Sequence, residues 1–237
     1  MCAAPCDTTG PPSTVTVTRG GDATADTVRP RPVQLRDECS LPGEAYVARS
    51  AWREARLAAC PRHPRGGCGV VRHGTYPRRT PVGMRIARYY CPTARETFSL
   101  LPDCLASHFP GELDAIEHVV ATVEAARSIE AAADHLRPEI TLAAAVRWVR
   151  RRLRPVRVAL ITVVTLWPDR VVGPPRVSSL RTTLTTTSAL VALRTHGAAH
   201  LALLPTPLGF QPRRRARAKV PRGRPHRMGA DRAGPGG

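Results

Sequence analysis

The stretch that decides the fold is residues 112–153, which read ELDAIEHVVATVEAARSIEAAADHLRPEITLAAAVRWVRRRL. Its apolar residues recur every three or four positions, which is the spacing of one buried stripe on a helix. Ser128 is a typical N-cap residue and predicts the start of a second helix. Arg137 precedes a proline and therefore avoids helical angles, so the second helix should stop there. Thr141 can cap a third helix over residues 142–153.

The third of these helices has two chemically different faces. The apolar side carries Leu142, Val146, Val149 and Leu153. The opposite, basic side carries Arg147, Arg150, Arg151 and Arg154. Small residues near its start, Ala143 and Ala144, would let the backbone approach a groove floor while the arginines reach phosphates and base edges. A helix, a short turn and a basic helix form a helix-turn-helix reader. The alternative is a three-helix bundle whose arginines are only solvated.

The charge of the chain points to a polyanionic partner. Its formal net charge is +18 and its pI is about 11.3, which is typical of nucleic-acid binding. Residues 110–140 hold seven acids and two arginines, a net of −5, whereas residues 141–160 hold six arginines and no acid, a net of +6. A basic tail at residues 211–237 should attract phosphates of any sequence. Its arginine cluster consists of Arg213, Arg214, Arg215 and Arg217. We therefore expect duplex DNA as the partner.

Residues 60–101 contain the second informative pattern. Cys60-Pro-Arg-His63 and Gly67-Cys68-Gly69 come before Arg72-His-Gly-Thr-Tyr76, and residues 85–91 and 97–101 read as strands. Strand pairs that begin at a ligand knuckle build a zinc ribbon, in which the metal supplies folding energy that so small a core lacks. The odd number of cysteines, seven, and the absence of an export segment disfavour a disulfide framework.

These motifs resemble the N-terminal zinc ribbon of bacterial insertion-sequence transposases and related uncharacterised proteins. A helix-turn-helix commonly follows the ribbon in that family, and the resemblance here covers residues 60–153. The second knuckle departs from the pattern, because Cys91-Pro-Thr-Ala94 lacks its second cysteine.

Four residues of suitable type remain as zinc ligands, and the expected set is Cys60, His63, Cys68 and Cys91. His73 and Cys104 are reserves for the same role. The alternative is a ribbon that has lost its metal and keeps its cysteines as small buried residues.

The expected fold class is mainly α with a small β zinc-ribbon-like module, a helix-turn-helix bundle, C-terminal helices and disordered termini. Pro155 should end the third helix, since proline interrupts a helix interior. The expected segments are a disordered leader at 1–42, a short helix and degenerate ribbon at 43–109, the helix-turn-helix at 110–154, C-terminal helices at 155–210 and a basic disordered tail at 211–237.

The sequence carries no recognisable catalytic set. Transposases cut DNA with three carboxylates that hold two metal ions, but after Arg150 only Asp169 and Asp231 remain. We therefore expect a non-catalytic DNA-binding protein of transposase-related type, with no membrane span and no small-molecule substrate, located in the cytoplasm at the nucleoid. The alternative is a structural or protein-interaction remnant of a mobile-element protein without sequence-specific DNA binding.

Overall fold

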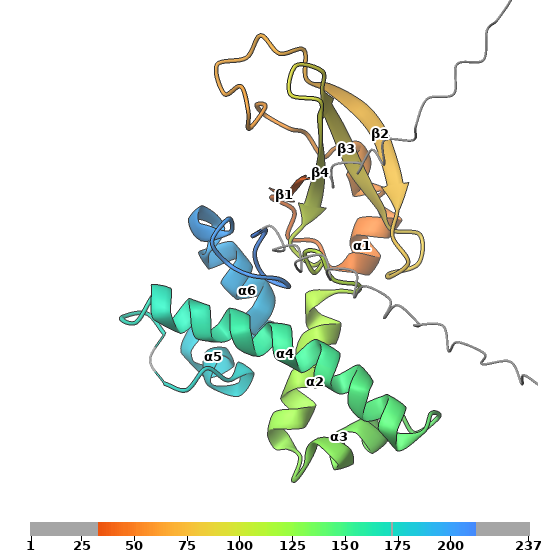
Figure 1. Ribbon diagram of the computed structural model, residues 1–237, viewed down its shortest axis with the longest axis vertical. Helices are drawn as coiled ribbons and strands as arrows, with labels where there is room; N and C mark the ends of the chain where they lie inside the picture. The colour runs from red at the N-terminus through yellow and green to blue at the C-terminus, as the bar shows by residue number, and fades with distance from the viewer. Residues whose placement is uncertain (1–32, 172, 212–237) are drawn as a thin grey trace, which may run out of the picture. The chain divides into compact units, whose positions relative to one another are not determined.

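A four-stranded sheet and a group of helices make up the computed structural model, which describes residues 33–171 and 173–211 (Figure 1). All the described residues fall within one compact unit. The sheet half contains β1 (Val33–Asp37), α1 (Gly43–Ala48), the 3-10 turn η1 (Ala51–Arg53), β2 (Val71–Pro77), β3 (Arg85–Cys91) and β4 (Glu96–Pro102). The helical half contains α2 (Leu113–Ala125), α3 (Ile129–Leu136), α4 (Leu142–Leu166), α5 (Val177–Leu184), α6 (Ala189–His196) and η2 (Ala198–His200).

The sheet has the order β1-β4-β3-β2, with β1 parallel to β4 and the other pairs antiparallel. Alternation along β3 sends Ala87 and Tyr89 to one face and Arg88 and Tyr90 to the other. The pairing of β2 with β3 shifts at His73. Gly74 follows this bulge with a φ of 102°, a backbone conformation that glycine adopts without strain.

The first strand corrects the expected leader. Residues 33–37 form β1, whereas residues 1–32 of that segment lie outside the described part. Each residue of β1 is half-buried beside β4, and the pairing runs from Val33 opposite Phe98 to Asp37 opposite Pro102. The sequence could not show this, because the partner strand lies more than sixty residues away and a parallel pair has no hairpin turn to mark it.

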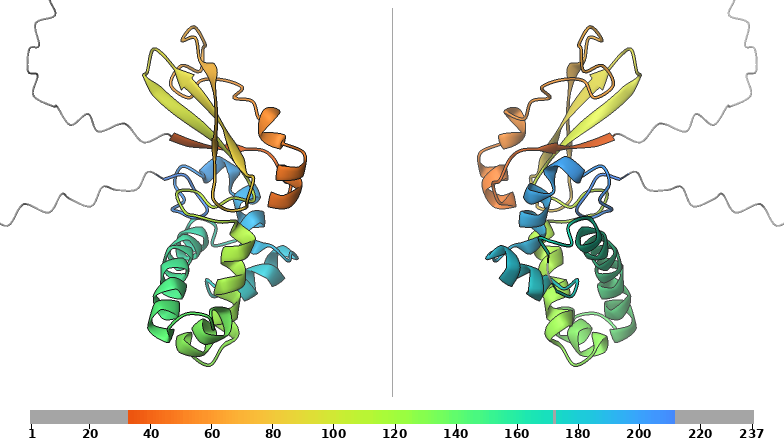
Figure 2. Two further views of the ribbon diagram at one scale, coloured as in Figure 1. Left: turned by 90° about the vertical axis from the view of Figure 1, so that its right-hand side faces the viewer. Right: turned by 90° about the vertical axis from the view of Figure 1, so that its left-hand side faces the viewer.

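The helices α2, α3 and α4 form where the apolar periodicity predicts them. Ser128 caps α3 by accepting the backbone N–H of Ala131 at 3.0 Å, which confirms its predicted role. Thr141 precedes α4 as expected, but its side chain makes no cap hydrogen bond. Both views of Figure 2 show α3 between the adjoining ends of α2 and α4. The three helices share one apolar core with α5 and α6.

The prediction that Pro155 ends the basic helix is wrong, because α4 continues through it to Leu166. Proline removes one backbone hydrogen bond and costs about 3 kcal/mol in a helix interior. Burial on both sides of Pro155 offsets this cost. The buried residues of α4 beyond Val149 are Leu153, Val156, Ala159, Leu160 and Val163. Residues 155–166, which were expected to belong to separate C-terminal helices, are therefore part of α4, and Val158 and Ile161 are exposed on its outer side.

Two acids of α2 hold the C-terminal helices in place. Glu117 is 1% exposed, and its carboxylate accepts the backbone N–H groups of Ala189 and Leu190 and pairs with Arg181. Glu124 accepts the N–H groups of Val177 and Ser178 in the same way. Carboxylates at helix N-termini satisfy free N–H groups and favour the helix dipole. The acids of α2 are therefore not all solvated, because these two cap α5 and α6.

Arg194 joins the helical half to the end of the sheet. Its guanidinium is fully buried and donates to the backbone carbonyls of Asp103, Leu105, Pro207 and Leu208. Burial lowers its pKa to about 10, so it stays charged at neutral pH. A buried cation of this kind is tolerated only when its donors are satisfied.

The expected fold class, mainly α, is wrong. The described residues are 42% helical and 17% strand, with six helices and a four-stranded mixed sheet, so the fold is α/β in character. The sheet is larger than the predicted ribbon because β1 extends it. Among the described helices, none combines the length and the apolar character that crossing a membrane requires.

Replacing Pro155 with alanine should stabilise the protein. The new N–H can donate to the carbonyl of Arg151, so the free energy of unfolding should rise by about 1–3 kcal/mol. Chemical denaturation of wild type and variant measures the difference. The matched control is Pro168→Ala, which lies just beyond the end of α4 and restores no helical hydrogen bond. An unchanged or lowered stability of Pro155→Ala contradicts the account.

Replacing Arg194 with leucine should destabilise the protein by roughly 3–5 kcal/mol, because buried carbonyl groups lose their donors. Thermal unfolding measures the change. Arg170→Leu, at an exposed arginine in the turn after α4, should leave the melting temperature within error of wild type. Equal stability of the two variants would show that Arg194 does not join the two halves.

Candidate metal centre and nucleic-acid interface

The structure brings Cys60, His63, Cys68 and Cys91 together at one end of the sheet. One ligand atom from each lies within 4.8 Å of every other, so the group is close enough to hold a metal ion. The three cysteines are buried and His63 is half-buried. This is the set expected from the sequence, and Cys91 points toward Cys60 and Cys68 rather than away from them.

The distances around His63 fit a tetrahedral ion. Its Nδ1 lies 3.6 Å from the Sγ of Cys60 and 3.5 Å from the Sγ of Cys91. A tetrahedral zinc with Zn–S near 2.3 Å and Zn–N near 2.0 Å separates sulfur and nitrogen by about 3.5 Å. These two distances match those from a nitrogen corner to the sulfur corners of such a site, so Nδ1 is the nitrogen of His63 that is placed to bind an ion.

Backbone N–H groups lie near each cysteine sulfur. That of Ala94 donates to the Sγ of Cys91 at 3.3 Å. Those of Arg62 and His63 favour the thiolate of Cys60, and that of Val70 favours the thiolate of Cys68. Such bonds favour a thiolate over a thiol and orient it toward the metal. Ala94 itself offers no ligand atom, but its backbone N–H donates to Cys91, and His63 is the fourth residue of the group.

The segment that carries the first three ligands is a loop with little apolar content. Cys60 begins a tight turn closed by the N–H of His63 on its carbonyl at 3.0 Å. Gly66 and Gly67 follow with φ values of 81° and 79°, which turn the chain back toward Cys68. The cluster beneath this loop contains the three cysteines and Phe98 as its buried members.

The surroundings of Cys60 and Cys68 shift the pKa values of their thiols in opposite directions. Burial alone raises the pKa of Cys60, but hydrogen bonds from His63 and the backbone outweigh it and lower the pKa to about 6. Burial raises the pKa of Cys68, the backbone N–H of Val70 opposes this, and the neighbouring thiols of Cys60 and Cys91 add to the rise. The thiolate is therefore favoured at Cys60, and a divalent cation beside Cys68 would favour its thiolate as well.

The two reserve ligands lie elsewhere. His73 is exposed on β2, with its ring 5.7 Å from the ring of Tyr90. Cys104 is buried in a separate apolar cluster beside Leu105, and burial raises its pKa to about 12. Neither belongs to the metal-binding group.

The basic face of α4 is exposed as the sequence predicts. Its four arginines, Arg147, Arg150, Arg151 and Arg154, are exposed. Ala143 is exposed at the start of this helix, so its backbone is open to a groove. Leu142 departs from the prediction, since it is 48% exposed rather than part of the buried side.

Only part of this basic face is engaged within the protein. Arg150 lies 3.9 Å from Glu130 of α3, and both side chains are more than half exposed, so the pair is weak. Arg152 packs on the ring of Trp148 at 3.7 Å, with Arg137 on the same ring at 4.9 Å. The predicted tail contacts at Arg213, Arg214, Arg215 and Arg217 lie outside the described residues.

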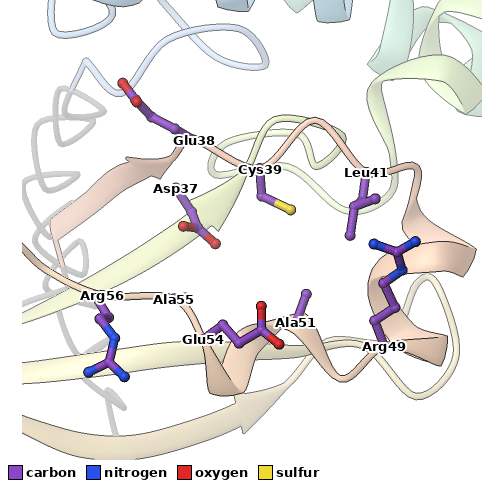
Figure 3. Close-up of a pocket in the computed structure, with 9 residues that line it drawn as sticks. All are labelled: Asp37, Glu38, Cys39, Leu41, Arg49, Ala51, Glu54, Ala55 and Arg56. Carbon is purple, nitrogen blue, oxygen red and sulfur yellow. The ribbon is translucent and has the colours of Figure 1, made fainter.

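A pocket of about 480 Å³ lies beside β1 and η1 (Figure 3). The side chains of Asp37, Cys39 and Glu54 point into it, whereas Glu38 and Arg56 point away. Burial raises the pKa of Asp37 and of Cys39, so the thiol stays protonated at neutral pH. No histidine is among the residues that line the pocket. The Cys39 thiol therefore has no histidine beside it in the pocket to activate it as a nucleophile.

Two polar residues of the sheet were not singled out from the sequence. Arg88 and Ser99 lie directly opposite each other on β3 and β4, and both have buried polar atoms without a hydrogen-bond partner. The alternation of residues 85–91 could have placed Arg88 and Tyr90 on one face, but nothing in the sequence shows Ser99 beside them.

Comparisons with protein families, curated proteins and solved structures find no match to this chain.

Metal analysis tests the cluster. Purified protein should carry about one zinc per chain, and Cys91→Ala and His63→Ala should each lose most of it, since a structural site needs four ligands. Cys39→Ala is the matched control, because Cys39 is a free cysteine of the same half outside the cluster. Chelation should lower the melting temperature of wild type and of Cys39→Ala. Zinc at equal stoichiometry in Cys91→Ala and wild type would contradict the assignment.

Proposed function

We propose that this protein is a non-catalytic duplex DNA-binding protein of transposase-related type that carries a structural zinc ion. The observation that carries the proposal is the exposed basic face of α4, which follows α3 after a short turn. Zinc has a structural role in it, because a closed set of four protein ligands leaves no position for a water or a substrate.

The surroundings of α4 support entry into a DNA groove. Its first turn is exposed at Thr141, Leu142 and Ala143, so the backbone can approach a groove without rearrangement. Arg147 and Arg151 follow one and two turns later, and neither forms an ion pair with an acid of the described residues. Arginine side chains in this position bind phosphates or the O6 and N7 atoms of guanine.

The helix also stands on a rigid base. Val146, Val149 and Leu153 are buried on the side opposite the arginines, against the core shared with α2 and α3. A reader helix must be held firmly, since a loosely placed side chain loses base discrimination. A protein with this function would be located in the cytoplasm, in association with the nucleoid.

A non-catalytic role fits the positions of the acids. Glu117 and Glu124 are used to cap helices. Asp169 is exposed in the turn after α4 and belongs to none of the candidate metal-binding groups of the described residues. The alternative proposal is a protein-interaction role without sequence-specific DNA binding, which the exposed apolar residues Val158 and Ile161 on α4 favour.

Binding to duplex DNA separates the two proposals. A selected duplex site and random duplex should be titrated at several salt concentrations with wild type and Arg147→Ala. A lost base contact should cost about 1–3 kcal/mol on the selected site and much less on random DNA. Arg170→Ala, exposed just beyond α4, is the control for simple loss of charge.

Deletion of residues 213–219 should act differently. It should weaken binding to both duplexes and flatten the salt dependence, because phosphate contacts release counterions regardless of sequence. If Arg147→Ala lowers the affinity for selected and random DNA equally, α4 is only a charged surface and the interaction role is preferred.

A further inference from the structure

The two faces of the sheet differ in what covers them. Residues opposite one another on paired strands share a face. On one face, the hydroxyl of Tyr89 donates to the carbonyl of Ala55 at 2.9 Å, and Arg72 donates to the carbonyl of Trp52. The other face, which we call the open face, carries Val71, His73, Tyr76, Arg88, Tyr90, Thr97 and Ser99, and at its far end Ile86 and Leu101 are buried in the apolar cluster that contains Tyr46 and Trp52. Val71 is 55% exposed and His73 is exposed, so solvent reaches the part of this face that lies beside β2.

The open face holds two polar groups that the protein leaves unpaired. Ser99 is fully buried, and its Oγ has no hydrogen-bond partner. The Nε of Arg88, directly opposite on β3, is also buried without a partner. No described carboxylate forms an ion pair with Arg88. A buried donor without an acceptor costs about 1–3 kcal/mol, so a ligand oxygen that accepts from both groups would recover that energy. Phosphate oxygens are such acceptors.

Aromatic rings lie on either side of this polar pair. The Tyr90 ring lies 5.7 Å from the His73 ring at a tilt of 44°, toward one end of the face. The Tyr76 ring lies beneath the Arg88 guanidinium at 5.2 Å, toward the other end. A cation beside half-exposed rings suits a nucleotide as ligand. The guanidinium pairs with the negative charge of the phosphate, and a ring stacks on the flat base.

We propose that the open face binds unpaired nucleotides of a DNA strand. Because the Nε of Arg88 and the Oγ of Ser99 are buried in the free protein, the half-buried Arg88 side chain must shift on binding; both groups then donate to one phosphate, and the adjoining base packs against Tyr90 and His73. Unpaired bases are the ligand because a duplex keeps its base faces stacked and unavailable to side chains. The inference rests on the proposed function for DNA as the partner, but its residues are separate from α4.

Fluorescence anisotropy of the full chain tests the proposal. The probes are a labelled oligo-dT of about 12 nucleotides, which suits one binding face, its ribonucleotide counterpart, and the selected duplex. Wild type should bind oligo-dT, and Arg88→Gln and Tyr90→Leu should each weaken that binding about fivefold or more, in the range of one lost base or phosphate contact. The affinity of both variants for the duplex should stay within about twofold.

The matched control is Arg85→Gln. Arg85 lies on the same strand but on the opposite face, where it is exposed and donates to Thr75. It removes the same charge and should leave oligo-dT binding unchanged. Melting temperature and zinc content of every variant report whether the sheet is intact, and Tyr90→Leu keeps the charge if Arg88→Gln fails to fold.

Three outcomes would overturn the proposal: wild type does not bind oligo-dT, Arg88→Gln binds it as Arg85→Gln does, or Arg88→Gln and Tyr90→Leu lose duplex and oligo-dT affinity equally. Tighter binding of the ribonucleotide strand would overturn the assignment to DNA. Failure of the proposed function would look different. Arg147→Ala would then leave the ratio of affinities for selected and random duplex unchanged, while Arg88→Gln and Tyr90→Leu would still weaken the binding of oligo-dT.

Discussion

The approach of His63 Nδ1 to two cysteine sulfurs is the constraint on which this end of the sheet depends. The loop between Cys60 and Cys68 is rich in glycine, proline and arginine, and it offers almost nothing to an apolar core. Beneath it the buried members of the cluster are the three cysteines and Phe98. Eleven residues, 60–70, run from Cys60 to the start of β2, and ordering them costs conformational entropy. The burial of so few side chains offsets little of that cost. A metal ion held by these four residues would supply the stabilisation that this loop lacks.

The positive charge of the chain has more than one physical role. Arg194 and Arg78 donate to backbone carbonyls where the sheet meets the helices, and Arg36 pairs with the buried Asp103. These guanidinium groups stabilise the fold and are not available to a partner. Arg147 and Arg151 are exposed on a helix that has no acid of its own. A net charge of +18 is therefore a weak guide to function, and the position of each arginine is the informative quantity.

Sequence patterns predicted correctly those features that depend on contacts between residues close together in the chain. The cysteine and histidine spacing gave the four residues that converge, and Ser128 marked the start of α3, because ligand knuckles and caps are set by neighbours in the chain. Distant contacts were missed. β1 pairs with a strand that lies far along the sequence, and Glu117 caps a helix more than seventy residues away. Pro155 was read as a break because its local cost is visible in the sequence, whereas the burial that offsets it is not. The mixed sheet was missed, and the fold class was predicted wrongly, for the same reason: contacts between residues far apart in the sequence leave no local pattern.

X-ray absorption at the zinc edge of purified protein tests the metal centre, on which the account is built, most directly. The account predicts a first shell of three sulfurs near 2.3 Å and one nitrogen near 2.0 Å, with the nitrogen signal replaced in His63→Cys by a fourth sulfur. A spectrum without zinc, or one in which oxygen ligands at about 2.0–2.2 Å replace the sulfurs, would contradict it.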